Sequence, residues 1–144
     1  MNSTIAQLNE LIAITRDGQR FYEHACTEVR NARLRTLFRD MSQVKDEVIQ
    51  ALAMKVVDHH EAPASGGTFV GRLLQVYADT RASLTGDEEA TYVAQLEQAE
   101  DRILQAFEDA LECAEDDVRA LLVAEMPKVR ACHERMRSLR HELH

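Results

Sequence analysis

Apolar residues recur along most of the chain at alternating steps of three and four, the spacing of one face of an α-helix. Five stretches show this pattern and predict helices at residues 4–29, 32–58, 68–84, 88–113 and 117–142. In the second stretch, we expect the core to be formed by Leu34, Leu37, Met41, Val44, Val48 and Ala51. Because helices of about 26 residues are about 40 Å long, the pattern predicts one long helical bundle domain over residues 1–144.

Residues that begin and end helices stand between these stretches. Asn31 has the chemistry of an N-cap for the second helix, because its side chain can accept hydrogen bonds from the first free backbone amides. Residues 61–67 combine one proline and two glycines, which predicts a loop. Pro127 falls inside the last periodic stretch, where we expect a kink or a missing backbone hydrogen bond.

The composition supports an all-α fold and excludes several functions. The chain of 144 residues has 5 glycines, 2 prolines and 5% aromatic residues, too few for a typical sandwich or barrel. Its formal net charge of −8 argues against a nucleic-acid partner. With no apolar run near the roughly 20 residues that span a bilayer, no signal peptide and three widely separated cysteines, we expect no membrane contact and a cytoplasmic location.

The first and last hairpins of the predicted bundle are similar in sequence. The segment Tyr22–Ala25 resembles Phe107–Ala110 at an offset of 85 residues, and the same offset places Leu37 on Leu122 and Lys45 on Arg130. Two antiparallel hairpins related in this way need a connection that travels the length of the bundle. We expect the helix at 68–84 to be that crossover.

The chain resembles a family of bacterial ferritin-like four-helix-bundle proteins that is known as a domain of unknown function. It is more distantly similar to rubrerythrin and ferritin. The likeness is carried by Leu8–Ile12, Asp17–Gly18, Leu37–Phe38, Leu84–Gly86, Glu100–Asp101 and Ala131–Met136. The resemblance implies a ferritin-like four-helix bundle with an additional short crossover helix.

The same resemblance implies where a di-iron centre would lie. Metal-binding members of this architecture use a Glu on each of two helices and a Glu-x-x-His on each of the other two. The matching positions here are Thr15, Lys45, Val48, Glu100, Arg130 and His133. Only Glu100 and His133 are ligand types, and two positions are cations, which would repel iron. We therefore expect no di-iron centre, cofactor or catalytic residue, and we expect Lys45 and Arg130 to pair with Glu100 and neighbouring carboxylates.

Three functions remain open at this point. The first is a non-catalytic binding or assembly role, with a stress-associated role suggested by the wider ferritin-like group; its homodimer would form through Phe69, Leu73, Val76 and Tyr77 of the 68–84 helix. The second is a metal-dependent oxidoreductase or metal store that uses the reduced ligand set Glu100, His133, Glu125 and Glu23. The third is an adaptor that presents a groove to the amphipathic helix of a partner.

Overall fold

The computed structural model describes residues 3–65 and 88–143, and the described residues form four α-helices with no strand. These are α1 (Ser3–Glu28), α2 (Ala32–Asp58), α4 (Glu88–Cys113) and α5 (Asp116–Leu143). Each begins and ends within one residue of a helix predicted from the periodicity. The fifth helix predicted at 68–84, the expected crossover, lies outside the described residues. No described helix has the length and apolar character needed to cross a membrane.

Local chemistry explains where the helices begin and end. Asn31 caps α2 as predicted, and its side chain accepts hydrogen bonds from the amides of Arg33 and Leu34 at 2.9 and 3.1 Å. At the other end of α2, His60 adopts a left-handed φ of 62°, which reverses the chain. Pro127 lies within α5, which continues through it as one helix, with the proline on the exposed side.

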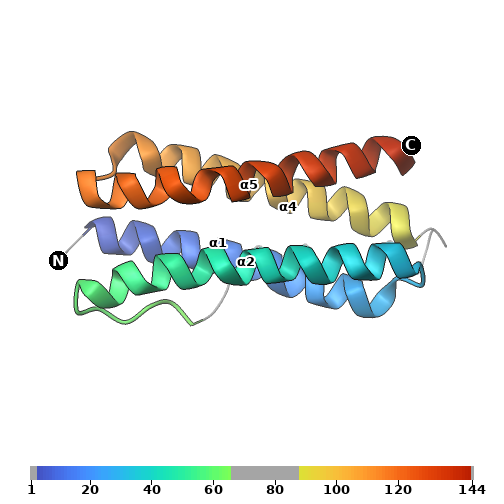
Figure 1. The fold of residues 1–144 in the computed structure, drawn as a ribbon, viewed down its shortest axis with the longest axis horizontal. Helices are drawn as coiled ribbons and strands as arrows, with labels where there is room; N and C mark the ends of the chain where they lie inside the picture. Colours follow the sequence, from blue (N-terminus) through green and yellow to red (C-terminus); the bar gives the residue numbers. More distant parts are fainter. Residues whose placement is uncertain (1–2, 66–87, 144) are drawn as a thin grey trace.

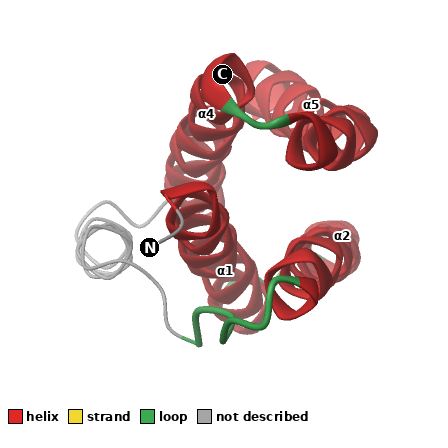
Figure 2. Cartoon of the chain, turned by 90° about the vertical axis from the view of Figure 1, so that its left-hand side faces the viewer, coloured by secondary structure: helices red, strands yellow, loops and turns green. Residues whose placement is uncertain are grey.

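The helices are arranged as two antiparallel hairpins, α1 with α2 and α4 with α5 (Figure 1). Between the hairpins, α1 packs against α4 more extensively than α2 packs against α5, so that α1 and α4 lie together when the bundle is viewed from its end (Figure 2). Because α2 and α4 run in the same direction, residues 59–87 connect opposite ends of the bundle. This is the hairpin–crossover–hairpin order that the internal repeat predicted.

The described start of this connection lies along α1. The backbone of Ala64 donates to Asn9 at 2.8 Å, and its carbonyl accepts from Arg16 at 3.4 Å. One residue further, the carbonyl of Ser65 accepts from Arg20 at 3.5 Å. The order of these contacts shows that the chain runs parallel to α1, toward the end of the bundle where α4 begins.

The interior consists of two hydrophobic clusters. One joins the N-terminal halves of α1 and α5 to the C-terminal halves of α2 and α4, and it includes Leu8, Leu52 and Leu122. The other occupies the opposite end of the bundle and includes Phe38 and Met136. Buried polar residues lie between the two clusters on three helices, Thr15 on α1, Lys45 on α2 and Glu100 on α4, and this polar layer is the candidate site.

The buried face of α2 differs in part from the one predicted. Leu34, Met41 and Val48 are buried as expected, and Phe38, Lys45, Ile49, Leu52 and Val56 complete the face. Leu37, Val44 and Ala51 are only partly buried, because they lie about one residue's rotation to the side of this line. The predicted apolar stripe on α2 therefore combined the core face with a neighbouring side of the helix.

Candidate functional site

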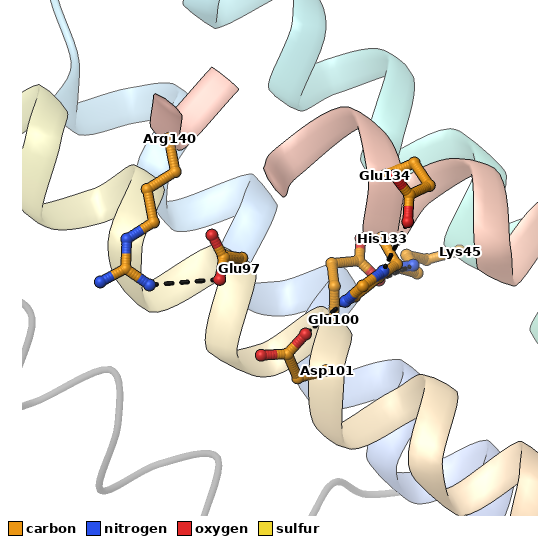
Figure 3. Close-up of polar contacts among 7 residues, drawn as sticks. All are labelled: Lys45, Glu97, Glu100, Asp101, His133, Glu134 and Arg140. Atoms are coloured by element: carbon orange, nitrogen blue, oxygen red, sulfur yellow. Dashed lines mark hydrogen bonds and ion pairs between the residues drawn. The ribbon is translucent and has the colours of Figure 1, made fainter. Parts of the chain in front are cut away.

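A lysine, a glutamate and a tyrosine from three different helices meet in the polar layer. The Nζ of Lys45 on α2 lies 2.5 Å from Oε1 of Glu100 on α4 (Figure 3). The hydroxyl of Tyr22 on α1 donates to the other carboxylate oxygen, Oε2, at 2.5 Å. None of the three residues is more than 1% exposed. The contact between Lys45 and Glu100 is the pairing that the sequence predicted.

Each polar group of this cluster compensates another. An isolated charge in a bundle interior costs several kcal/mol, and a buried polar atom with no hydrogen-bond partner is also unfavourable. The ammonium of Lys45 balances the carboxylate of Glu100, and Tyr22 satisfies the oxygen that Lys45 does not reach. The arrangement is a closed ion pair in which both oxygens of Glu100 are already used.

Burial keeps protons on the two weak acids of this layer. Burial raises the pKa of Tyr22 well above its ordinary 10.0, and the charge of Glu100 and the hydrogen bond to it act in the same direction. Burial also raises the pKa of Cys132 from 9.0, although the positive charge of Lys45 opposes the shift. A protonated, buried thiol is a poor nucleophile and a poor metal ligand. We therefore assign Cys132 a packing role beside the ion pair.

Gly18 makes room for this layer on α1. A Cβ atom at this position would lie 2.8 Å from Cδ1 of Ile103 and 3.8 Å from Cε of Lys45. The first distance is shorter than a normal carbon contact, so a side chain here would force Ile103 to move. The missing side chain of Gly18 lets α1 approach α4 closely at the level where the stem of Lys45 passes.

Comparison with known proteins places this bundle in a family. The model of the family described as "Domain of unknown function (DUF2383)" matches residues 3–113. The chain belongs to the DUF2383 family. No curated protein and no solved structure matches it. The matched part of this DUF2383 chain contains Tyr22, Lys45 and Glu100 and ends at the last residue of α4.

Two other positions implied by the ferritin-like resemblance are buried in the DUF2383 bundle without being able to bind a metal. Thr15 is fully buried, and its hydroxyl donates to the carbonyl of Leu11 in the same helix at 2.7 Å. Val48 is 1% exposed and belongs to the hydrophobic cluster that contains Leu8 and Leu52. Neither side chain supplies a carboxylate or an imidazole to the polar layer.

The expectation that Arg130 points inward with Lys45 is wrong. Arg130 is exposed, and the neighbouring Val129 is buried in its place. The reason is a shift of one residue in the internal repeat: the buried positions of α2 match those of α5 when Lys45 is set against Val129. The two hairpins therefore share a pattern of buried positions, but only one of them contributes a cation to the interior.

The other candidate ligands have separate partners. His133 pairs with Asp101 of α4 and also lies 3.5 Å from Glu134, and the Asp101 and Glu134 side chains are about half or more exposed (Figure 3). Glu125 pairs with Lys128 at 3.4 Å, and Glu23 is exposed. Across residues 3–65 and 88–143, no group of three or more His, Cys, Asp or Glu side chains is arranged to hold a metal ion.

Sequence reasoning identified Lys45 and Glu100 but not the part that Tyr22 plays. The signal was present, because Tyr22 continues the steps of three and four residues that run through Ile5, Leu8 and Ile12 in the first helix. A tyrosine on such a face needs a partner for its hydroxyl, and the carboxylate at the same level of the bundle is a natural acceptor. The close approach at Gly18 had no comparable signal, since it depends on how two helices pack.

Proposed function

We propose that this DUF2383 protein is a ferritin-like bundle that acts by binding or assembly and uses no di-iron chemistry. The observation that carries the proposal is the 2.5 Å contact between Lys45 Nζ and Glu100 Oε1 in the interior of the bundle. The order of two hairpins joined by a connection along the bundle supports the ferritin-like assignment. A cytoplasmic location and a stress-associated role remain predictions from the sequence and from the resemblance.

The chemistry of the ion pair opposes metal binding at this position. A protonated lysine has no lone pair to give to a metal, and its charge repels a divalent cation. Glu100 would have to exchange a buried ammonium and a phenol for the metal. Such an exchange would also leave Lys45 buried without its partner, which costs several kcal/mol.

Metal analysis tests this proposal against the metal-dependent alternative. The purified chain is dialysed anaerobically against Fe²⁺ or Mn²⁺, and bound metal is measured by elemental analysis. We expect far less than one metal ion per chain, with no difference between the wild type and the Glu100→Ala/His133→Ala variant. Stoichiometric metal that is lost in this variant, but kept in a variant of the exposed Glu108→Ala, would establish the metal-binding alternative.

The assembly part of the proposal has a separate test. Light scattering of the full chain at micromolar concentration is expected to give the mass of a dimer. The predicted contact through 68–84 lies outside the described residues, so the measurement addresses the oligomeric state and not the surface used. A monomer throughout the micromolar range would contradict assembly and leave the metal result unaffected.

A further inference from the structure

The residues along one side of α2 are spaced so that two copies of the helix, placed antiparallel, would bring complementary side chains opposite each other. Alternating steps of four and three residues lead through positions 33, 37, 40, 44, 47, 51, 54 and 58, which we call the α2 seam. None of these positions is fully buried. Steps of this kind keep side chains on one side of a helix, as in the contact seam of a coiled coil. The steps follow the same order whether they are read from position 33 or from position 58. Each seam position of one copy therefore faces a seam position of a second, antiparallel copy.

The outer positions of the seam match in chemistry under this pairing. Arg33 would face Asp58 of the second copy, and Leu37 would face Met54. Arg33, Met54 and Asp58 are exposed, and Met54 is 68% exposed although it is apolar. Leu37 is partly buried at the opposite end of the helix. Antiparallel pairing therefore joins opposite charges and covers an apolar side chain that the single chain leaves in water.

The inner positions are compatible with the same arrangement. Val44 would face Glu47 and Asp40 would face Ala51, with no pair of like charges directly opposite. Glu47 already lies 4.0 Å from Lys128 on α5 of its own chain, so a compensating charge stands beside it. The centre of the seam falls between Lys45 and Asp46, close to the middle of the helix Ala32–Asp58.

A groove beside the seam offers a place for the exposed methionine. It lies between the N-terminal half of α2 and the C-terminal half of α5, and Leu34, Leu37 and Leu139 contribute apolar surface to it. Two arginines, Arg33 and Arg135, and two glutamates, Glu89 and Glu142, also line this groove. Under antiparallel pairing, the end of α2 that carries Met54 and Asp58 would lie over this groove in the other copy.

The distribution of charge along the two helices agrees with this orientation. Arg33, at the N-terminal end of the α2 seam, lines the same groove as Arg135 of α5. The opposite halves of these helices hold Asp58 on α2 and Asp116 and Asp117 at the start of α5. A two-fold axis across the middle of α2 places Arg33 and Arg135 of each copy near Asp58 of the other.

We propose that two copies of this chain associate through the α2 seam, with their α2 helices antiparallel about a two-fold axis. This inference rests on the assembly part of the proposed function and assigns the dimer to the α2 seam in place of the 68–84 contact expected from the sequence. Two neighbouring helices present a face about 40 Å long and about 20 Å wide, on the order of 800 Å² per partner. That area is typical of a specific protein–protein interface.

Charge exchange between two variants tests the pairing. Arg33→Glu and Asp58→Arg each place like charges opposite one another twice in the dimer. Both changes suit the dipole of α2, because an acid then stands near its N-terminus and a base at its C-terminus, so neither is expected to unfold the helix. Sedimentation velocity at low salt is expected to show that each variant alone dimerises at least about tenfold more weakly than the wild type.

An equimolar mixture of the two variants is expected to recover a heterodimer, because each contact between position 33 and position 58 then joins opposite charges again. Gln98→Glu on the exposed side of α4 is the matched control and should dimerise like the wild type. A dimer that both single variants leave unchanged would overturn the α2 seam but preserve the assembly proposal. A wild-type chain that is monomeric throughout would overturn both.

Discussion

The Nζ of Lys45 and Oε1 of Glu100 are 2.5 Å apart, and neither side chain is more than 2% exposed. The pair joins α2 to α4 across the two hairpins, and Tyr22 adds α1 through the second oxygen of the same carboxylate. Three of the four described helices thus meet in one polar contact. The energetic consequences of this contact can be measured directly.

Removing one partner of the ion pair should destabilise the protein far more than removing both. Lys45→Met leaves Glu100 buried with no cation, and Glu100→Met leaves Lys45 with no anion, so each variant is expected to lose about 3–5 kcal/mol of unfolding free energy. The Lys45→Met/Glu100→Met double variant should recover most of this loss. Chemical denaturation gives the three values, and single variants within about 1 kcal/mol of the wild type would contradict a buried, mutually compensated pair.

The raised pKa of Tyr22 predicts a loss of stability in alkali. In the unfolded chain this phenol ionises near its ordinary pKa of 10.0, whereas in the folded chain it keeps its proton to higher pH. The stability from this group is therefore complete below pH 10.0 and decreases as pH rises above that value. Tyrosinate absorbance of the folded protein should be the same in the wild type and in Tyr22→Phe at a pH where exposed tyrosines ionise. A lower absorbance in Tyr22→Phe before unfolding would show that Tyr22 titrates normally.

The close approach at Gly18 predicts an interaction between two substitutions. Gly18→Ala should gain up to about 1 kcal/mol of helix propensity, but its new methyl group meets Cδ1 of Ile103 at 2.8 Å. Ile103→Val removes that carbon. We therefore expect Gly18→Ala to be more favourable in the Ile103→Val background than in the wild type, as measured by a double-mutant cycle. Equal effects in both backgrounds would mean that the two helices do not meet at this point.

A substitution of His60, whose backbone is in the left-handed region just after α2, should stabilise the protein. His60 holds a φ of 62°, which costs a side chain about 1 kcal/mol and costs glycine almost nothing. His60→Gly is expected to raise the unfolding free energy by about 0.5–1 kcal/mol, measured by thermal or chemical denaturation. His60→Ala, which keeps the Cβ atom, serves as the control and should give no such gain.

The sequence was sufficient for the four described helices because their periodicity, the Asn31 cap and the loop after α2 are local signals. The ferritin-like resemblance also identified Lys45 and Glu100 as partners, because it places both at ligand positions in the interior of the bundle. The resemblance and the internal repeat both placed Arg130 opposite Lys45, one residue away from the match of the buried positions, and a single residue turns a side chain by about 100°. An error of one residue's rotation also explains why Leu37, Val44 and Ala51 were assigned to the core, although they are positions of the α2 seam.

What the sequence could not supply depends on contacts between helices. The short distance between Gly18 and Ile103 and the division of the core into two clusters follow from how the hairpins approach each other. The pairing of His133 with Asp101 likewise depends on the rotation of α5 against α4. None of these features has a periodic signal in one chain taken alone.

The polar layer between the two hydrophobic clusters also limits how the helices can slide. If α4 moved along α2 by one turn, about 5.4 Å, Leu96 or Ile103 would face Lys45, and both charges would be buried apart. An entirely apolar interior would accept such a slip with little penalty, because one leucine replaces another. We therefore expect the ion pair to exclude the shifted packings that four similar amphipathic helices would otherwise populate.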